Sequence, residues 1–490
     1  MNIQLQVVGH ALRAVAEEMG AALIRSAFSA NIKERRDCST ALFDDRGRMV
    51  AQAEHIPVHL GAMPDAVAAV MELDPAREDV FVLNDPFAGG THLPDITLVS
   101  RTDVGFAVSR AHHADVGGVE PGSMPAFSAS LDDEGVVIPP TRVQPDTLAA
   151  LAARMRNPDE RLGDFRAQLA ANRLADKRVA ELCARHGVDR IRAAMDELLA
   201  YSERVVRAGI ARLPAGRYEA SDVLEAPEAE LELRVAVTVG GDTVEVDFDG
   251  TASQHPGNLN CPLSVTRSAT YFVVRCVTDP DVPASAGAFA PVRIAAPPGS
   301  LVNARPGAAV AGGNVETSCR IVDVLFRALA QALPVPAQGQ GTMNNITLGN
   351  ERFTYYETLG GGQGACPDGD GPPGVHVTMS NTLTTPIEAL ELSYPVRIRR
   401  HELRLGSGGD GRHRGGDGIV REIEALEDCR ASILSERRAH APAGADGGCA
   451  GAPGRNLLNG RELSAKATVA LARGDVLRVE TPGGGGFGRR

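Results

Sequence analysis

Residues 55–113 hold five of the chain's 12 histidines, and aspartates stand among and just after them. The histidines are His55, His59, His92, His112 and His113, and three nearby aspartates are Asp85, Asp95 and Asp115. Two imidazoles and a carboxylate with an open position form a common ligand set for catalytic Zn²⁺, Mn²⁺ or Fe²⁺. Such an ion can lower the pKa of bound water to about 7. These residue types favour a divalent metal site, although histidines that are merely hydrogen-bonded in loops would give the same spacing.

Two short motifs could supply the ligands. His92 and Asp95 lie three residues apart in THLPD, where Pro94 favours a rigid loop over a helix. AHHAD adds His112 and His113 at the end of an expected strand. Since neighbouring strand residues face opposite ways, only one of these two histidines should point toward the other ligands. Oxygen ligands from aspartate would shift the preference somewhat toward Mn²⁺.

Three other features of the sequence indicate a functional site less clearly. Asp37 precedes a strand, and spacing alone favours a turn cap over a fourth ligand. The glycine-rich segments do not match GxxxxGK[ST], so we expect glycines of positive φ in turns and no ATP site on this chain. Cys38, Cys319 and Cys366 have no feature that would activate a thiol, and we expect them to be small buried residues.

The elements that must position these residues can be placed from periodicity. Apolar residues at helical spacing predict a helix over residues 5–25. A hairpin follows over 38–53 with its turn at 44–47, and a second helix begins near Pro64. Strands at 80–83, 96–100 and 105–115 surround the polar loop 84–95. A strand, a polar loop and a returning strand make a suitable floor for a site.

Beyond this region, residues 158–213 form a helical pattern that breaks near His186 and Gly187, and a hairpin turns at Gly240 and Gly241. Buried helices are expected over 264–277 and 314–333, the second capped by Asn314. We expect an α+β fold: a multi-layer mixed-sheet core with a helical insertion and a β-rich C-terminal part. The expected regions are a metal-site α/β region (1–150), a helical hairpin (151–215), an α+β region (216–340) and a β-rich C-terminal region (341–490).

Composition excludes several functional classes for the 490 residues. Lys and Arg total 50 against 62 Asp and Glu, a net charge of −12, and aromatic residues make up 4%. Nucleic-acid-binding proteins normally carry a basic surplus, so that class is disfavoured. No apolar run reaches 18 residues, and the first twenty residues do not resemble a signal peptide. The eight cysteines form no CxxC pair, so we expect a cytoplasmic protein with reduced thiols and no membrane partner.

Seven segments together resemble the hydantoinase B/oxoprolinase family, from the N-terminal helix to the last ten residues. They are ERRDCSTALFDDRGRMVAQAEHIPVHLGAMP, NDPFAGGTHLPDITLVS, AHHADVGGVEPGSMP, AGGNVETSCRIVDVL, VTMSNTLTTPIEALELSYPVRIRRHELR, GRHRGGDGIVREIE and TPGGGGFG. The family includes B subunits of N-methylhydantoinase and caprolactamase, the C-terminal half of 5-oxoprolinase, and subunits of acetone and acetophenone carboxylases.

This resemblance implies a division of labour within a hetero-oligomer. A separate A-type subunit with an actin-like ATPase fold binds ATP and phosphorylates the small-molecule substrate, and the B-type chain holds a metal ion and completes ring opening of a cyclic amide. By motif, the metal ligands would be Asp37, His92, Asp95 and one histidine of AHHAD, for which we choose His113. Asp115 and the remaining histidine, His112, are then the expected catalytic proton acceptors.

Two other functions fit the same motifs. The chain could be the matching metal-binding subunit of an ATP-dependent acetone- or acetophenone-type carboxylase, and nothing in the motifs separates the two activities. It could also be a non-enzymatic scaffold with a closed metal shell. Bicarbonate-dependent ATP consumption would identify the carboxylase, and ligand substitutions without effect on turnover would identify the scaffold.

Overall fold

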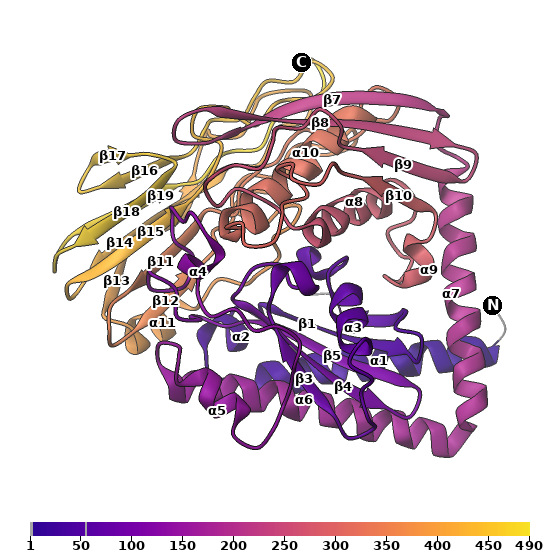
Figure 1. Ribbon diagram of the computed structural model, residues 1–490. Coiled ribbons are helices and arrows are strands. Elements are labelled where there is room, and N and C mark those ends of the chain that lie inside the picture. Colours follow the sequence, from indigo (N-terminus) through magenta and orange to yellow (C-terminus); the bar gives the residue numbers. More distant parts are fainter. Residues whose placement is uncertain (1–2, 54–55) are drawn as a thin grey trace.

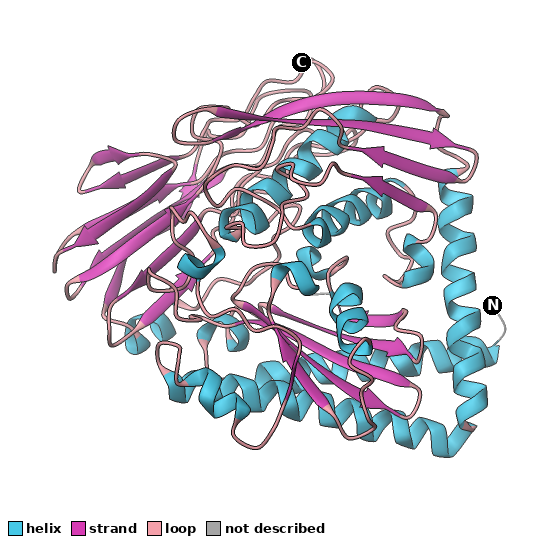
Figure 2. Cartoon of the chain, in the orientation of Figure 1, coloured by secondary structure: helices cyan, strands magenta, loops and turns pink. Residues whose placement is uncertain are grey.

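The computed structural model describes residues 3–53 and 56–490. The helices of these residues are α1 (Ile3–Ser26), α2 (Ala30–Lys33), α3 (Met63–Met71), α4 (Leu131–Glu134), α5 (Thr147–Ala152), α6 (Pro158–His186), α7 (Val188–Ile210), α8 (Leu263–Val277), α9 (Ala286–Phe289), α10 (Ser318–Leu329) and α11 (Ile387–Ser393). Short 3₁₀ turns are η1 (Pro57–His59) and η2 (Pro86–Ala88), and η3 (Gly313–Thr317) is a π turn. The strands of the described residues form four sheets (Figures 1 and 2).

The N-terminal region forms a six-stranded antiparallel sheet. Its strands, in spatial order, are β2 (Met49–Ala53), β1 (Cys38–Asp44), β5 (Gly105–His112), β4 (Asp95–Thr102), β3 (Val80–Leu83) and β6 (Thr141–Arg142). Helices α1 and α6 run along one face of this sheet (Figure 1). The predicted helix is confirmed in α1, since residues at its helical spacing from Val8 to Leu23 are all buried. The helices therefore cover one face of the sheet and leave one end of its central strands for the site.

Local turn chemistry explains two further confirmed predictions. In the β1–β2 hairpin, the Asp44 carboxylate accepts hydrogen bonds from the backbone N–H groups of Arg46 and Arg48, and Gly47 has a φ of 74°. In the helical insertion, Gly187 has a φ of 88° between α6 and α7, so it ends one helix and begins the next.

A second sheet covers a pair of buried helices. Its strands, in spatial order, are β10 (Val292–Ala295), β9 (Thr243–Asp247), β8 (Glu230–Gly240) and β7 (Gly216–Glu225). The hairpin predicted around Gly240 and Gly241 is confirmed between β8 and β9. Helices α8 and α10 lie side by side beneath this sheet (Figure 1). Their apolar faces join the largest hydrophobic cluster, which also takes residues from the six-stranded sheet.

The C-terminal part carries two antiparallel sheets. One contains β12 (Thr354–Glu357), β11 (Asn345–Gly349), β15 (Cys429–Leu434) and β18 (Lys466–Leu471). The other contains β13 (Val396–Arg404), β14 (Gly418–Ala425), β19 (Val476–Glu480), β16 (Arg455–Leu458) and β17 (Arg461–Leu463). The mixture of helices and several sheets confirms the expected α+β fold and the β-rich C-terminal part, while the four-region division of the chain stays a prediction.

The expectation of positive φ holds for Gly89 and Gly374, each in one of the glycine-rich segments, but the segment 481–486 corrects it. None of the glycines in 481–486 has a positive φ. A Cβ on Gly484 would collide with the backbone oxygen of Gln363, and a Cβ on Gly485 with that of Ala443. Their N–H groups donate to Gly416 and Gln338. Glycine is needed here because extended segments pack backbone against backbone, and their N–H groups are engaged within that packing.

A second correction concerns Asn314. It does not cap α10, because the π turn η3 precedes the helix and Asn314 lies inside that turn. π turns are frequent at functional sites.

Among the described residues, no helix has both the length and the apolar character needed to cross a bilayer.

Candidate metal centre

Three strands of the six-stranded sheet bring polar side chains to one edge. Asp95 is the first residue of β4 and His112 is the last of β5, and the two are direct cross-strand partners. Asp37 immediately precedes β1, and its carbonyl accepts the backbone N–H of His112 at 3.0 Å. His92 lies in the loop that enters β4, and its carbonyl accepts the N–H of Asp95 at 3.1 Å. Strand pairing therefore assembles residues that lie up to 75 positions apart (37 to 112).

The side chains at this edge converge on one another. Asp95 Oδ2 lies 3.3 Å from His92 Nδ1, and Asp95 Oδ1 lies 3.4 Å from His112 Nδ1. His92 Nε2 lies 3.3 Å from His112 Nδ1. One ligand atom from each of these three residues falls within 4.8 Å of the others, an arrangement that can hold a metal ion.

His59 and Asp37 complete the cluster. Asp37, His59 and Asp95 form a second group whose ligand atoms lie within the same limit. His59 Nε2 lies 3.3 Å from Asp95 Oδ2, and its other nitrogen, Nδ1, lies 2.9 Å from Ser39 Oγ. The second contact orients the imidazole. We did not assign His59 a role from the sequence, although it stands among the five histidines, because no regular spacing links it to THLPD. Hereafter, "the His/Asp cluster" means Asp37, His59, His92, Asp95 and His112.

Several atoms of the cluster lack hydrogen-bond partners among the described residues. They are His92 Nδ1, Asp95 Oδ1 and His112 Nε2, all of them buried. The first two of these atoms have only the long contacts given above, His92 Nδ1 with Asp95 Oδ2 and Asp95 Oδ1 with His112 Nδ1. Because buried polar atoms are nearly always satisfied, such a cluster favours a bound ligand. Burial lowers the pKa of His92 to about 3, which leaves a neutral imidazole with a lone pair for coordination. This donor set, imidazole nitrogen with carboxylate oxygen, suits Zn²⁺, Mn²⁺ or Fe²⁺.

The structure separates the two histidines of AHHAD. His112 lies in the cluster, whereas His113 points to the opposite side of the sheet, where its Nε2 lies 3.0 Å from Gln168 Oε1. Its ring packs against Phe165 at a centroid distance of 4.8 Å. Only one of the two histidines points toward His92 and Asp95, as alternation required. It is His112, whereas we expected His113 at that position. The physical reason is the β4–β5 register, which sets His112 opposite Asp95.

Asp115 is not brought to the cluster. Its Oδ1 accepts the N–H of Gly117 at 2.7 Å, and its Oδ2 accepts the N–H of Gly122 at 2.8 Å and Arg156 Nη1 at 3.0 Å. These contacts stabilise the loop that follows β5. His55, the remaining histidine of the sequence cluster, lies outside the described residues.

The cluster lines a small cavity of about 20 Å³, which is room for one water molecule or ion. The ring of Tyr356 stacks on His112 at 4.5 Å with an interplanar angle of 10°. Arg35, fully buried, donates to the carbonyl of Tyr356 at 2.8 Å and to Thr358 Oγ1 at 2.6 Å. These contacts link the N-terminal sheet to the C-terminal part, so both are needed to close the cavity.

Asn314, from the π turn, lines the same cavity, and its Oδ1 has no hydrogen-bond partner among the described residues. As an N-cap, the carboxamide would have accepted a hydrogen bond from the backbone of the helix, whereas in the π turn it lines the cavity. The rest of the wall comes from residues 379–382 of the loop before α11.

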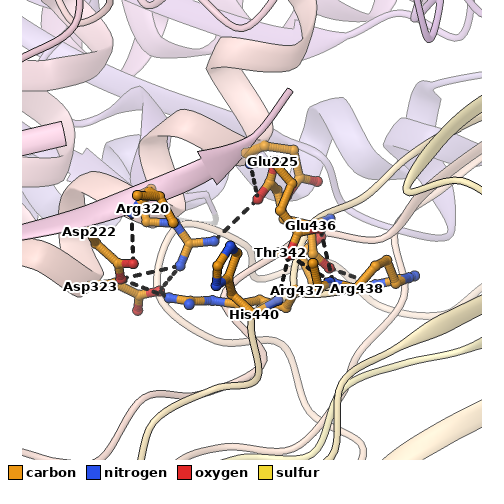
Figure 3. A network of polar contacts seen from close by, with 12 residues as sticks. Asp222, Glu225, Arg320, Asp323, Thr342, Glu436, Arg437, Arg438 and His440 are labelled. Atoms are coloured by element: carbon orange, nitrogen blue, oxygen red, sulfur yellow. Dashed lines mark hydrogen bonds and ion pairs between the residues drawn. The ribbon is translucent and has the colours of Figure 1, made fainter. Parts of the chain in front are cut away.

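A second buried polar group lies between β7, α10 and the segment after β15 (Figure 3). Arg320 and Arg437 contact Asp323 Oδ2 at 2.9 and 2.6 Å. Lys466 contacts Glu436 at 2.6 Å. Glu225 accepts the backbone N–H groups that follow Arg437. Hereafter this group, "the charge network", means Asp222, Glu225, Arg320, Asp323, Glu436, Arg437, Arg438 and Lys466.

Known proteins resemble the whole chain. The family model described as hydantoinase B/oxoprolinase matches residues 1–490. The 5-oxoprolinase 1 of Arabidopsis thaliana is 39% identical, and the alignment covers 99% of this chain and 42% of the plant protein. The chain thus spans less than half the length of that relative.

Solved structures resemble it as well. The ATP-dependent caprolactamase from Pseudomonas jessenii has a TM-score of 0.93 and 27% identity, covering 99% of this chain and 91% of that chain. A nucleotide-free acetone carboxylase, at 18% identity, shares the fold with a TM-score of 0.88, covering 99% of this chain and 75% of that chain.

Proposed function

This chain belongs to the hydantoinase B/oxoprolinase family, and from that premise we propose that it is the metal-binding B-type subunit of an ATP-dependent cyclic amidase. Its substrates would be rings with an internal amide, such as hydantoins, 5-oxoproline or lactams. The observation that carries the proposal is the His/Asp cluster, in which His92, Asp95 and His112 direct unpartnered atoms at one small cavity.

We propose Asp95, His92 and His112 as ligands, with Asp37 and His59 beside them. A divalent ion bound there would act as a Lewis acid toward an oxygen of the substrate or of water. His112 thus takes the ligand role first given to His113. Asp115 as proton acceptor stays a prediction, although both its oxygens have other partners.

The chain's own residues preorganise the cluster. Thr91 Oγ1 donates to Asp95 Oδ2 at 2.5 Å, and Ser39 Oγ lies 2.9 Å from His59 Nδ1. Tyr356 holds the plane of His112 by stacking. The wall of buried side chains excludes bulk water, which strengthens electrostatic interactions inside the cavity. The cluster is therefore held before substrate arrives, and reaction requires little rearrangement of the ligands.

ATP is needed because an unstrained amide is stabilised by resonance and reacts slowly with water. We propose that a separate A-type subunit binds ATP and transfers its terminal phosphoryl group to the amide oxygen. More than half of the plant 5-oxoprolinase lies outside the match to this chain, which supports a second functional part. Overall, a cyclic amide, ATP and two water molecules give ADP, phosphate and an amino acid, which is N-carbamoylated when the substrate is a hydantoin. One water adds across the broken C–N bond, and the other balances cleavage of the phosphoanhydride.

The test is co-expression with an A-type subunit from the same genome, followed by metal analysis and a screen for phosphate release. The probes are hydantoin, 5-oxoproline, ε-caprolactam, and acetone with bicarbonate. We expect phosphate release with a cyclic amide, together with the ring-opened product. Release only with acetone and bicarbonate would overturn the amidase proposal in favour of a carboxylase.

The matched variants are His92→Ala and His113→Ala, which remove two buried histidines on opposite sides of the sheet. The first should lose bound metal and turnover while its circular dichroism stays native. The second should keep its metal. A folded His92→Ala protein with full metal content would overturn the ligand assignment.

A further inference from the structure

The cavity at the His/Asp cluster is too small for any cyclic amide. Its volume of about 20 Å³ admits one water molecule or ion. A five- to seven-membered ring must therefore be held in another space, from which its amide group can reach the cluster. Such a space lies on the other side of the wall formed by the loop before α11.

A larger cavity of about 700 Å³ shares this wall. It lies at the ends of α8 and α10, between residues 333–339 and 443–446. Val377 and Thr378 line the larger cavity, while the next residues, 379–382, line the cavity of the cluster. The two spaces are therefore separated by a single turn, in which Ser380 N–H donates to the carbonyl of Val377 at 3.3 Å.

This turn is strained at its centre. Thr378 has a φ of 55°, a conformation that a β-branched residue rarely adopts. Its Oγ1 is buried and has no hydrogen-bond partner among the described residues. Such strain persists where the surroundings enforce it, and it is concentrated at functional sites. Strain and an unsatisfied hydroxyl both lower the cost of moving the turn.

The end of the turn is anchored more firmly. Thr382 Oγ1 lies 2.7 Å from Thr358 Oγ1 and 3.1 Å from Arg35 Nη2. His376 Nδ1 lies 2.6 Å from Ser380 Oγ. The anchors flank the strained residue, so movement can be confined to residues 377–379 while the remaining wall of the cluster stays in place.

The lining of the larger cavity indicates the chemical class of its ligand. Most lining side chains are apolar, and they include Phe272, Phe326, Leu333, Val335 and Val377. The cation among the described lining residues is Arg327, which is exposed and donates to the carbonyl of Ser221 at 2.9 Å. Two carboxylates also line it: Asp323, which is paired with Arg320 and Arg437, and the exposed Asp446. This surface suits an uncharged ring, and its described lining residues offer a substrate carboxylate no buried cation.

We propose that the 700 Å³ cavity binds the ring of an uncharged cyclic amide, and that the turn Val377–Ser380 is the passage from this cavity to the His/Asp cluster. This inference rests on the proposed function and names its substrate class: unsubstituted or alkyl lactams rather than 5-oxoproline. The cavity volume lies in the range typical of small-molecule sites.

Cys276 offers a direct reporter of occupancy, since it is exposed and lines the cavity. Cys449 is also exposed but is not part of this lining, so it serves as an internal control. The full chain is alkylated with N-ethylmaleimide at mildly alkaline pH, with and without ε-caprolactam, and labelling is followed by peptide mass spectrometry. Although the residue is exposed, desolvation by the side chains around its thiol raises the pKa of Cys276, so its labelling is slow enough to follow.

We expect ε-caprolactam to slow the labelling of Cys276 at least fivefold, to leave Cys449 unchanged, and to protect better than 5-oxoproline. Equal protection of both cysteines, no protection, or stronger protection by 5-oxoproline would overturn the proposal. Protection by the A-type subunit alone would also overturn it, because the cavity would then be a subunit contact.

A second pair of variants tests the same space without chemistry at the thiol. Ala330 and Ala211 are exposed alanines at the C-caps of α10 and α7, and only Ala330 lines the cavity. Ala330→Trp should abolish protection by ε-caprolactam and raise the KM for the lactam at least tenfold, whereas Ala211→Trp should leave both unchanged. Unchanged protection in Ala330→Trp would contradict the assignment.

Failure of this inference and failure of the proposed function can be told apart. Protection of Cys276 needs neither ATP nor turnover. Turnover of lactams without protection would overturn the cavity and leave the amidase in place. Protection without lactam-dependent phosphate release would overturn the amidase and leave a lactam-binding cavity.

Discussion

Two of the polar groups that the molecule buries are built in opposite ways. In the charge network, Asp323 and Glu436 each contact a cation within 3 Å. In the His/Asp cluster, carboxylates and imidazoles face one another, and three of their atoms have no hydrogen-bond partner among the described residues. The His/Asp cluster is almost fully removed from solvent, and so is the charge network except for the half-buried Glu225 and Arg438.

The difference separates groups that hold the fold from groups that hold a ligand. A buried carboxylate that is paired with a cation stabilises the arrangement of elements that contribute the pair, and removing one partner is costly. Buried imidazole nitrogens and carboxylate oxygens that lack hydrogen-bond donors do not stabilise the fold by themselves, and they favour binding of a cation. Burial alone therefore does not identify function; the balance of partners does.

The largest effect on stability is expected in the charge network. Glu436→Ala leaves Lys466 and Arg320 without their buried carboxylate and should destabilise the protein by about 3–5 kcal/mol. The control is Glu462→Ala, which removes an exposed pair with Arg455 and should cost about 0–1 kcal/mol. Thermal unfolding measures both, and metal content should be unchanged in the folded variant. Equal stability of the two variants would remove the contrast between the groups.

The opposite outcome is expected for His112→Phe in the His/Asp cluster. Phenylalanine retains the stacking on Tyr356 and removes the unpartnered Nε2, but it also loses the long contacts of Nδ1 with Asp95 and His92. The metal-free variant should therefore be about as stable as the natural chain. Metal affinity should fall by about 100-fold or more. Elemental analysis and thermal unfolding after chelation check the two parts. A large loss of stability without loss of metal would show that the cluster is structural.

A third variant sharpens the comparison within AHHAD. His113→Phe removes the contact with Gln168, leaves a buried amide without its partner and should cost about 1–3 kcal/mol. Its bound metal should equal that of the natural chain. If His113→Phe lost metal and His112→Phe kept it, our first choice of ligand would be restored.

The last expected effect is a pH dependence of stability that arises at Glu316, whose carboxyl group lies near that of Glu436. Burial, followed by the charge of Glu436, raises the pKa of Glu316 from 4.5 to about 8. The folded chain thus binds this proton more tightly than the unfolded chain, so the carboxyl's contribution to stability falls as pH rises between these values. Glu316→Gln removes that contribution.

The Tm of Glu316→Gln, relative to the natural chain, should therefore increase with pH, by about 5 °C across this interval. Unfolding scans at a series of pH values measure the difference. Parallel pH profiles would show that Glu316 titrates normally.

Much of the fold and part of the site follow from local patterns. The apolar spacing from Val8 to Leu23 predicted α1, and the polar turn at Asp44 predicted the first hairpin, because both depend on neighbours within a few residues. His92, Asp95 and one histidine of AHHAD were predictable as a group because the strands that carry them are consecutive.

Contacts between distant segments could not be predicted in this way. Arg35 donates to the carbonyl of Tyr356, 321 residues away, and no periodicity links the two. His59 enters the cluster only through the packing of η1 against the sheet edge. Asn314 before an apolar run predicted a helix cap, but tertiary packing inserted a π turn and directed the carboxamide to the cavity. Alternation alone could not choose between His112 and His113.

The register of β4 and β5 makes the site vulnerable to changes made far from it. The two strands are joined by the short turn between Thr102 and Gly105, at the other end of the hairpin from Asp95 and His112. One inserted residue in that turn would slide β5 past β4 by a single position and exchange the two faces of the strand. Ala111 would then arrive where His112 stands, opposite Asp95, and the cluster would be lost although none of its residues had been mutated. Two inserted residues would restore the faces but set Arg110 opposite Asp95, so the length of this turn should be fixed.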